Sequence, residues 1–300
     1  MNLVEITSGL AKRCLNEERV AALREVYLAG RNRLSPLLRL VHGTFGVEDL
    51  RLHLQQRIGE DFEVLMIHSS VNSMKPMFTG GALELVRMLI DFCGPARTLA
   101  MPAFYFGEAG VGAYPTFVRK PRFDLTRTPS QMGLATELFR RMPGVVQSRH
   151  PVYRVAALGP LSQALTQGHE HAETAAGRGT PFEFMAAHDT RIIGIGKPVQ
   201  VLTQAHHTED LMGDAFPVPS HVNVPLPMVL VERGKEIAFE LRSRSVEGQF
   251  DIWKVRDLMS PSTLLEWKFR GVPMFATRAA DVSRQLFDAA QRGQTLYQPL

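Results

Sequence analysis

The sequence predicts an α/β fold, in which a central, mostly parallel or mixed sheet carries helices on both faces. Short, nearly continuous apolar runs recur between residues 62 and 196, and each is followed by a helical pattern. This alternation favours a sheet that is covered on both sides. After residue 220 the pattern changes to that of an antiparallel hairpin. With 300 residues, the chain is long enough for one large domain with a subdomain.

The strands are predicted from apolar runs that lack alternation, which is typical of strands buried on both faces. These runs cover residues 62–68, 98–104, 155–159 and 191–196. Apolar residues at helical spacing predict helices over 82–92 and about 131–142. We expect a long loop from residue 105 to residue 128.

The two ends of the chain are predicted to add further elements. Residues 1–45 are predicted to form an N-terminal helical extension, because Val20, Leu23 and Val26 lie at helical spacing. Residues 46–300 then form the main domain, and 220–300 form its subdomain. This subdomain combines a hairpin that turns near Gly234 with a terminal helix from about 279 to 291.

Composition argues against several classes of protein. The net charge of +4 is mild and no dense basic tract occurs, which argues against nucleic acid as a partner. No apolar run approaches the roughly 20 residues that a membrane span needs. Cys14 and Cys93 lie in unrelated contexts, so we expect no disulfide and a cytoplasmic protein. The sequence leaves a homodimer open.

The run from Thr203 to Asp210 is the strongest candidate for a catalytic element. His206 and Glu209 are three residues apart, so they share a face if the run is helical. A carboxylate beside an imidazole raises its basicity and fixes its tautomer, as a general base requires. The same residues could instead form a metal site with His169 or His171, although no His-Glu-x-x-His pattern or cysteine pair is present. They could also be no more than the solvated start of a helix.

Further polar and glycine-rich runs follow the predicted strands. Ser69 and Ser70 end the first strand, where α/β sheets place ligands, but neither lies in a Gly-x-Ser-x-Gly motif. Gly80-Gly81 before a helix indicates either a turn or amides for a pyrophosphate. Glycines before Thr180 let the backbone approach a ligand closely. No cysteine or serine stands out as a nucleophile, which favours direct acyl transfer from a thioester to an amine.

Taken in order, these motifs resemble those of the aminoglycoside 3-N-acetyltransferase family, also called antibiotic N-acetyltransferases. The likeness runs from about residue 46 to about residue 240. Its pieces are Gly46–Leu50, Val64–Ser70, Gly80-Gly81, Thr98–Phe104, Phe123-Asp124, Thr128–Gly133, Glu137–Arg140, Pro143–Pro151, Ala156–Gly159, Gly179–Pro181 and Thr203–Glu209.

The resemblance implies acetyl-CoA as the donor, a small-molecule amine as the acceptor, and a direct ternary-complex mechanism without a metal. It implies a base histidine ahead of the Gly-Thr-Pro turn, either His169 or His171, with His169 preferred. Glu209 would orient this base. The residues expected to bind the CoA moiety are Ser69, Ser70, Gly80, Gly81, Thr180, Pro181 and Phe182, and those expected to bind the acceptor are His206 and His171.

The sequence therefore predicts a CoA-dependent N-acetyltransferase that acts on an amine of an aminoglycoside or amino-sugar-like molecule. Arg154 departs from the serine that the family more often has after His-Pro. The mildly basic charge also keeps open a biosynthetic N-acyltransferase for a different amine, because polycations favour acidic clefts. A non-catalytic binding protein stays open as well, as does a metal-dependent hydrolase that uses His206, His207, Glu209 and Asp210.

Overall fold

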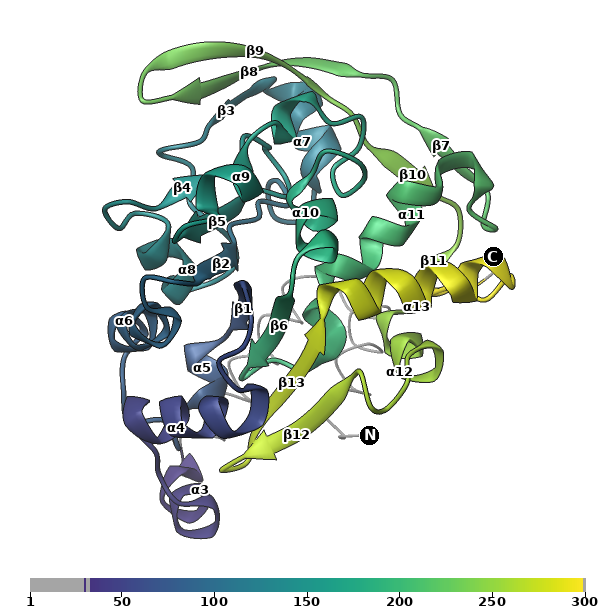
Figure 1. The fold of residues 1–300 in the computed structure, drawn as a ribbon. Helices are drawn as coiled ribbons and strands as arrows, with labels where there is room; N and C mark the ends of the chain where they lie inside the picture. Colours follow the sequence, from purple (N-terminus) through teal and green to yellow (C-terminus); the bar gives the residue numbers. More distant parts are fainter. Residues whose placement is uncertain (1–29, 31–32, 299–300) are drawn as a thin grey trace.

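The computed structural model describes residue 30 and residues 33–298 (Figure 1). The predicted helical segment around Val20, Leu23 and Val26 lies outside the described residues, as does Cys14. Within the predicted N-terminal extension, the structure contains the helix α3 (Ser35–His42). Among the helices of the described ranges, none is long and apolar enough to span a membrane.

A seven-stranded mixed sheet forms the centre of the fold, in the order β12-β13-β6-β1-β2-β5-β4. The three central strands β6, β1 and β2 are parallel, and the outer strands are antiparallel to their neighbours. The predicted mixed sheet is thus confirmed. Its strands are β1 (Val64–Ser69), β2 (Thr98–Pro102), β4 (Val146–Gln147), β5 (Val155–Leu158), β6 (Thr190–Ile195), β12 (Leu265–Phe269) and β13 (Val272–Arg278).

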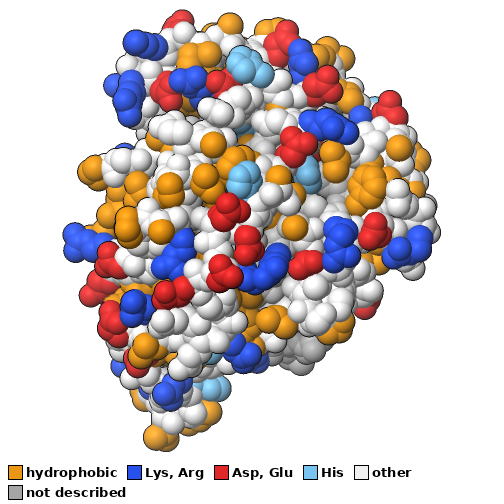
Figure 2. All heavy atoms as spheres, in the orientation of Figure 1, with side chains coloured by type: hydrophobic (Ala, Val, Ile, Leu, Met, Phe, Trp, Pro, Cys, Tyr) orange, Lys and Arg blue, Asp and Glu red, His pale blue; other side chains and the backbone are white. Residues whose placement is uncertain are grey.

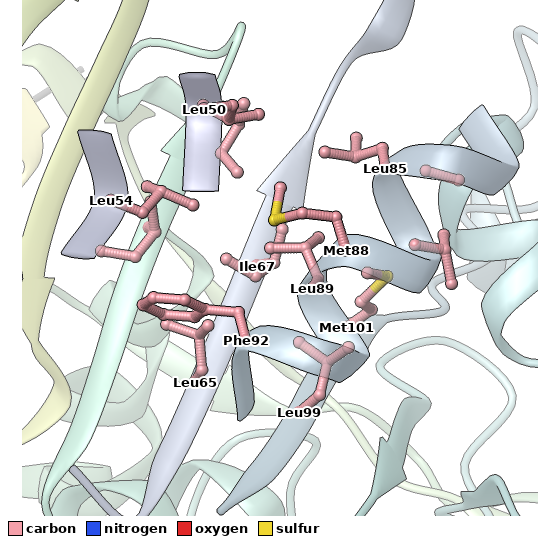
Figure 3. Close-up of a cluster of buried hydrophobic side chains, with 14 of the residues drawn as sticks. Leu50, Leu54, Leu65, Ile67, Leu85, Met88, Leu89, Phe92, Leu99 and Met101 are labelled. Carbon is pink, nitrogen blue, oxygen red and sulfur yellow. The ribbon is translucent and has the colours of Figure 1, made fainter. Parts of the chain in front are cut away.

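Strand β1 contributes to two separate cores, which explains its nearly continuous apolar sequence. Leu65 and Ile67 face the core beneath α4, α6 and α8, drawn in Figure 3. Val64 and Met66 face the opposite core, beneath α10 and α13. Burying each such side chain stabilises the fold by roughly 1.5–3 kcal/mol, so both layers of helices are held to the sheet.

The helices lie on both faces of the sheet, as predicted. The helices on and beside the first face are α4 (Val47–Ile58), α5 (Val71–Met74), α6 (Ala82–Cys93) and α8 (Leu134–Phe139). Those on and beside the second face are α9 (Ser162–Thr166), α10 (Pro181–Ala187), α11 (His206–Met212), α12 (Val255–Leu258) and α13 (Ala279–Gln291). The terminal helix has the bounds that the sequence predicts.

A smaller sheet contains the predicted hairpin, formed by β8 (Leu226–Glu232) and β9 (Lys235–Leu241). Its turn is made by Arg233 and Gly234, with φ of 51° and 82°. The prediction of a long loop over 105–128 is wrong in part, because α7 (Ala113–Arg119) and β3 (Arg122–Asp124) lie there. Strand β3 pairs with β8, and Phe117 and Phe123 join the hairpin's apolar cluster.

The C-terminal third of the chain also contributes to the main sheet. Strands β12 and β13, which the sequence analysis does not identify, extend the sheet beyond β6. The other strands described within residues 220–298 are the hairpin and two short strand pairs, which lie outside the main sheet. The predicted 220–300 segment is therefore shared between the main sheet and smaller sheets. The pairs are β7 (Ser220–Val222) with β10 (Arg244–Val246), and β11 (Gln249–Phe250) with β14 (Tyr297–Gln298).

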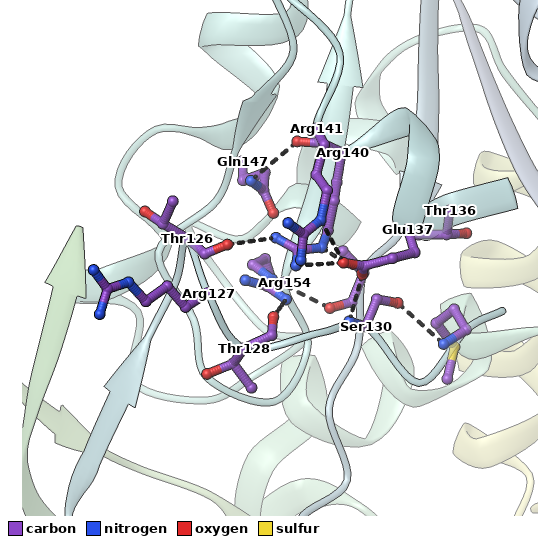
Figure 4. A network of polar contacts seen from close by, with 12 residues as sticks. Thr126, Arg127, Thr128, Ser130, Thr136, Glu137, Arg140, Arg141, Gln147 and Arg154 are labelled. Atoms are coloured by element: carbon purple, nitrogen blue, oxygen red, sulfur yellow. Dashed lines mark hydrogen bonds and ion pairs between the residues drawn. The ribbon is translucent and has the colours of Figure 1, made fainter. Parts of the chain in front are cut away.

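Arg154, the departure noted in the sequence, is a fully buried structural residue (Figure 4). Its guanidinium donates hydrogen bonds to the backbone carbonyls of Ala103, Leu125 and Thr128. The guanidinium also lies over the ring of Phe123, 5.4 Å from its centroid. Burial lowers the pKa of Arg154 to about 9. One side chain thus ties together the loops that follow β2 and β3.

Candidate active site

Helix α11 brings the two strongest candidate residues together. The Nδ1 atom of His206 lies 3.2 Å from each carboxylate oxygen of Glu209, one helical turn further on. The predicted shared helix face is therefore confirmed. The helix begins at His206 rather than near Thr203, because residues 203–205 form a 3-10 turn.

His206 is suited to accept a proton. Its side chain is 27% exposed, whereas that of Glu209 is 9% exposed. The imidazole lies against the rings of Phe250 and Tyr153, with centroids 4.8 and 6.1 Å away. Burial lowers the pKa of His206, but the hydrogen bond and the charge of Glu209 outweigh burial and raise this pKa above its ordinary value. The carboxylate thus stabilises the protonated imidazole.

A tyrosine from a distant part of the chain completes this group. The hydroxyl of Tyr297 donates a hydrogen bond of 2.8 Å to Glu209 Oε2. Tyr297 lies on β14, whose partner β11 carries Phe250. Sequence reasoning missed Tyr153, Phe250 and Tyr297, because none of them lies in a motif and their contacts depend on the tertiary fold.

His169, the base preferred from the sequence, does not pair with Glu209. Both of its ring nitrogens contact other groups, with Nδ1 2.9 Å from Ser148 Oγ and Nε2 2.9 Å from the Ala175 carbonyl oxygen. The ring is fully buried and stacks on His150 at 4.6 Å. Burial lowers the pKa of His169 to about 4. The imidazole beside Glu209 is that of His206 instead, and His171, the other candidate, is exposed.

The residues expected at the CoA site near β1 differ in whether their polar groups already have hydrogen-bond partners within the protein. Ser69 ends β1, and its buried hydroxyl has no hydrogen-bond partner among the described residues. The hydroxyl of Ser70 shares a hydrogen bond with Ser73 at the start of α5. The amide of Gly81 donates to the Glu84 carboxylate at 2.6 Å, so it is already satisfied within α6. Of the hydroxyls in this set, that of Ser69 is buried without a hydrogen-bond partner among the described residues, whereas that of Ser70 has one.

The Thr-Pro turn lies at the start of α10 and connects to the His206 group. The hydroxyl of Thr180 donates to the Gly177 carbonyl at 2.7 Å, and Pro181 is the first helical residue. The buried ring of Phe182 lies 6.0 Å from that of Tyr153, which contacts His206. No hydrogen bond or ring contact within residues 33–298 joins Ser69 or Ser70 to this group.

The side chains of the proposed metal cluster do not converge on one point. His207 Nδ1 contacts the Ala176 carbonyl at 2.5 Å, and the Asp210 carboxylate accepts from the Ala176 amide at 2.8 Å. Among the described residues there is no group of three histidine, cysteine or acidic side chains that could hold a metal ion. The arrangement of α11 therefore supports a proton-transfer site better than a metal centre.

An open cleft of about 590 Å³ lies beside Tyr297. The charged residues that line it are Glu247, Lys254 and Asp257. A smaller cavity lined by Glu209 shares Leu258, Gln294 and Thr295 with this cleft, so the cleft adjoins that cavity; His206 lines neither of the two. On the face in Figure 2, acidic and basic side chains are intermixed rather than separated by sign.

Comparison with known proteins supports the type of enzyme that the sequence motifs predict. The chain is 28% identical over 219 residues to aminoglycoside N(3)-acetyltransferase IX of Micromonospora chalcea, covering 67% of this chain and 74% of the relative. Its fold is similar to that of AAC-IIIb, solved as a binary complex with CoASH, with a TM-score of 0.68, 18% identity, and coverage of 85% of this chain and 100% of that one.

It is equally similar to AAC-VIa bound to sisomicin, with a TM-score of 0.68, 20% identity, and coverage of 84% and 100%. At these identities the two structures establish the fold. The family model for aminoglycoside 3-N-acetyltransferases matches residues 66–287, which is most of the chain. The chain therefore belongs to the aminoglycoside 3-N-acetyltransferase family and is an acyltransferase of that type.

Proposed function

We propose that the protein transfers an acetyl group from acetyl-CoA directly to an amine of an aminoglycoside or amino-sugar-like molecule, with His206 as the general base. The observation that carries this proposal is the couple of His206 and Glu209, in which the carboxylate lies 3.2 Å from Nδ1 of a partly exposed imidazole. The assignment replaces His169, whose two ring nitrogens contact other groups.

The proposed reaction follows from what an amine and a thioester require. An alkyl amine is largely protonated at neutral pH and cannot attack until it loses a proton. His206 accepts that proton, and Glu209 stabilises the imidazolium that forms; such assistance contributes typically ~10²–10⁴ in rate. The neutral nitrogen then bonds to the carbonyl carbon and carries one surplus proton. As the carbon–sulfur bond breaks, this second proton is transferred to the departing sulfur, and CoA leaves as the thiol. Holding both reactants in place contributes roughly 7–11 kcal/mol at best.

The cleft beside Tyr297 supports a cationic acceptor. Its volume of about 590 Å³ lies within the range of small-molecule sites. Glu247 and Asp257 place two carboxylates on its wall, and the ammonium of Lys254 is hydrogen-bonded to the Tyr297 carbonyl at 2.7 Å. Carboxylates on the wall favour ligands with several amino groups. The net charge of the whole chain is mildly basic, but these two carboxylates make the wall of the cleft suitable for a polycationic acceptor such as an aminoglycoside.

For the donor, we propose that the CoA moiety contacts Ser69 and the Thr180–Phe182 turn. The unpartnered hydroxyl of Ser69 supports the first contact. The ring contacts from Phe182 through Tyr153 to His206 support the second, because they link that turn to the base. Gly80 and Gly81 have less support as CoA contacts, because the Gly81 amide already donates a hydrogen bond to the Glu84 carboxylate.

The test is release of free CoA thiol from acetyl-CoA with a panel of aminoglycosides, amino sugars and amino acids. We expect His206→Gln to lower turnover about 100-fold or more, while the exposed His221→Gln on β7 serves as the matched control. Loss of turnover in His171→Gln but not in His206→Gln would move the base to His171. No thiol release with any amine, together with no thermal stabilisation by acetyl-CoA or CoA, would contradict the proposed function.

A further inference from the structure

Glu209 is held from two sides by donors that come from separate parts of the chain. On one side is Nδ1 of His206, in the same helix. On the other is the hydroxyl of Tyr297, 88 residues further along the chain, at 2.8 Å. A carboxylate accepts hydrogen bonds and donates none, so both contacts fix its position. A hydrogen bond from a neutral hydroxyl to a charged carboxylate is also stronger than one between two neutral groups.

Tyr297 is itself firmly placed. Its ring makes edge contacts with Phe216 and Phe250, at centroid distances of 6.0 and 5.3 Å. Its carbonyl accepts from the Lys254 ammonium at 2.7 Å, and the pairing of β14 with β11 fixes its backbone. The residue is 9% exposed. The hydroxyl therefore reaches Glu209 from a rigid support.

We propose that Tyr297 is a positioning residue, which holds the Glu209 carboxylate in place and limits how strongly that carboxylate favours the protonated form of His206. This inference rests on the proposed role of His206 as the base. Tyr297 lies beyond residue 287, where the family match ends. The part of the chain that makes this contact is therefore outside the stretch that identifies the family.

The Glu209 carboxylate is shared between two hydrogen-bond donors, the His206 imidazole and the Tyr297 hydroxyl. The hydroxyl of Tyr297 takes up part of the hydrogen-bonding capacity of Glu209 Oε2, which also contacts His206. Without the hydroxyl, the buried carboxylate keeps the imidazole as its neighbouring donor and favours the imidazolium more strongly. The pKa of His206 then rises, and a smaller fraction of the base is neutral near pH 7.

The test is Tyr297→Phe, which keeps the ring and removes the hydroxyl. The His206 side chain is titrated by NMR without substrates, and kcat/KM is measured across the pH range. We expect the pKa of His206 to rise and the acidic limb of kcat/KM to move to higher pH. Turnover near neutrality should fall roughly three- to tenfold and recover at alkaline pH. Tyr114→Phe is the matched control, because its hydroxyl donates to the Val224 carbonyl instead.

The outcomes separate this inference from the proposed function. An unchanged titration of His206 in Tyr297→Phe, or a loss of turnover that is uniform across pH, overturns the positioning role. If the wild-type protein transfers no acetyl group but Tyr297→Phe still raises the pKa of His206, the proposed function fails and the coupling of Tyr297 to His206 through Glu209 stands.

Discussion

Replacing Glu209 with glutamine tests the proposed couple most directly. Glutamine has nearly the same shape and still offers an oxygen to His206 and Tyr297, but it carries no charge. A unit charge 3.2 Å from a protonated Nδ1 contributes about 1 kcal/mol at the dielectric constant of water and about 5 kcal/mol at an effective value of 20. A 100-fold loss of turnover corresponds to about 2.7 kcal/mol, which lies within this range.

The direction in which the pH profile of Glu209→Gln shifts follows from the effect of Glu209 on the pKa of His206. Glu209 raises the pKa of His206, and burial alone lowers it. Glu209→Gln removes the raising effect, so the pKa of His206 falls and the base stays neutral to lower pH. We therefore expect turnover at the plateau to fall about 100-fold, while the acidic limb of kcat/KM moves to lower pH. These two effects are measured together from thiol release across the pH range.

The matched control is Glu236→Gln, which removes an exposed carboxylate paired with Arg122 on the surface of β9. It should leave both the plateau and the limb unchanged. The reasoning is refuted if Glu209→Gln keeps full turnover, or if its acidic limb stays in place or moves to higher pH. Tyr297→Phe is expected to move the same limb in the opposite direction, which makes the two variants a paired test.

Three further predictions concern stability and acceptor binding. Burial lowers the pKa of His169 to about 4. The neutral form of His169 therefore contributes about 3 kcal/mol to the free energy of unfolding above pH 6.5, and this contribution is lost as the pH falls towards 4. We expect His169→Phe to show a smaller fall in Tm on acidification than the wild-type protein. Arg154→Met leaves three backbone carbonyls without their donor and should lower the free energy of unfolding by about 3 kcal/mol or more in urea titrations; an unchanged midpoint would contradict this. Asp257→Asn, in the cleft, should raise KM for a polycationic acceptor several-fold at low salt and less at high salt, with kcat unchanged; an equal effect on a monoamine would count against a charge-selective cleft.

Most of the fold could be predicted because its elements carry local signals. The terminal helix has the predicted bounds of Ala279–Gln291, since helical spacing and the following Gly293 mark them. The hairpin is predictable because Gly234 marks a turn between two strand-like runs, and the structure pairs β8 with β9 around it. Strands β12 and β13 were not predicted, although Leu265–Phe269 alternates apolar and charged residues and the turn at Arg270 and Gly271 follows it, so this hairpin had a local signal that was overlooked. Their place in the sheet comes from pairing with β6.

The candidate site likewise contains some residues that the sequence could predict and others that it could not. His206 and Glu209 could be paired from their spacing, because a helix turns residues three apart onto one face. The choice between His169 and His206 as the imidazole beside Glu209 could not be made, since it depends on which groups surround each ring. Ser148, at 2.9 Å from the His169 ring, belongs to a loop that carries no signal for this contact. Tyr297 depends on the pairing of two strands with two residues each.

The position of Tyr297 also bears on when the protein becomes competent during its synthesis. Its hydroxyl reaches a carboxylate that was translated 88 residues earlier. A nascent chain that has just exposed α11 from the ribosome therefore carries the imidazole and its carboxylate, but without the phenol that restrains them. Maturation of the site must therefore await the translation of strand β14, well after α11 has been made.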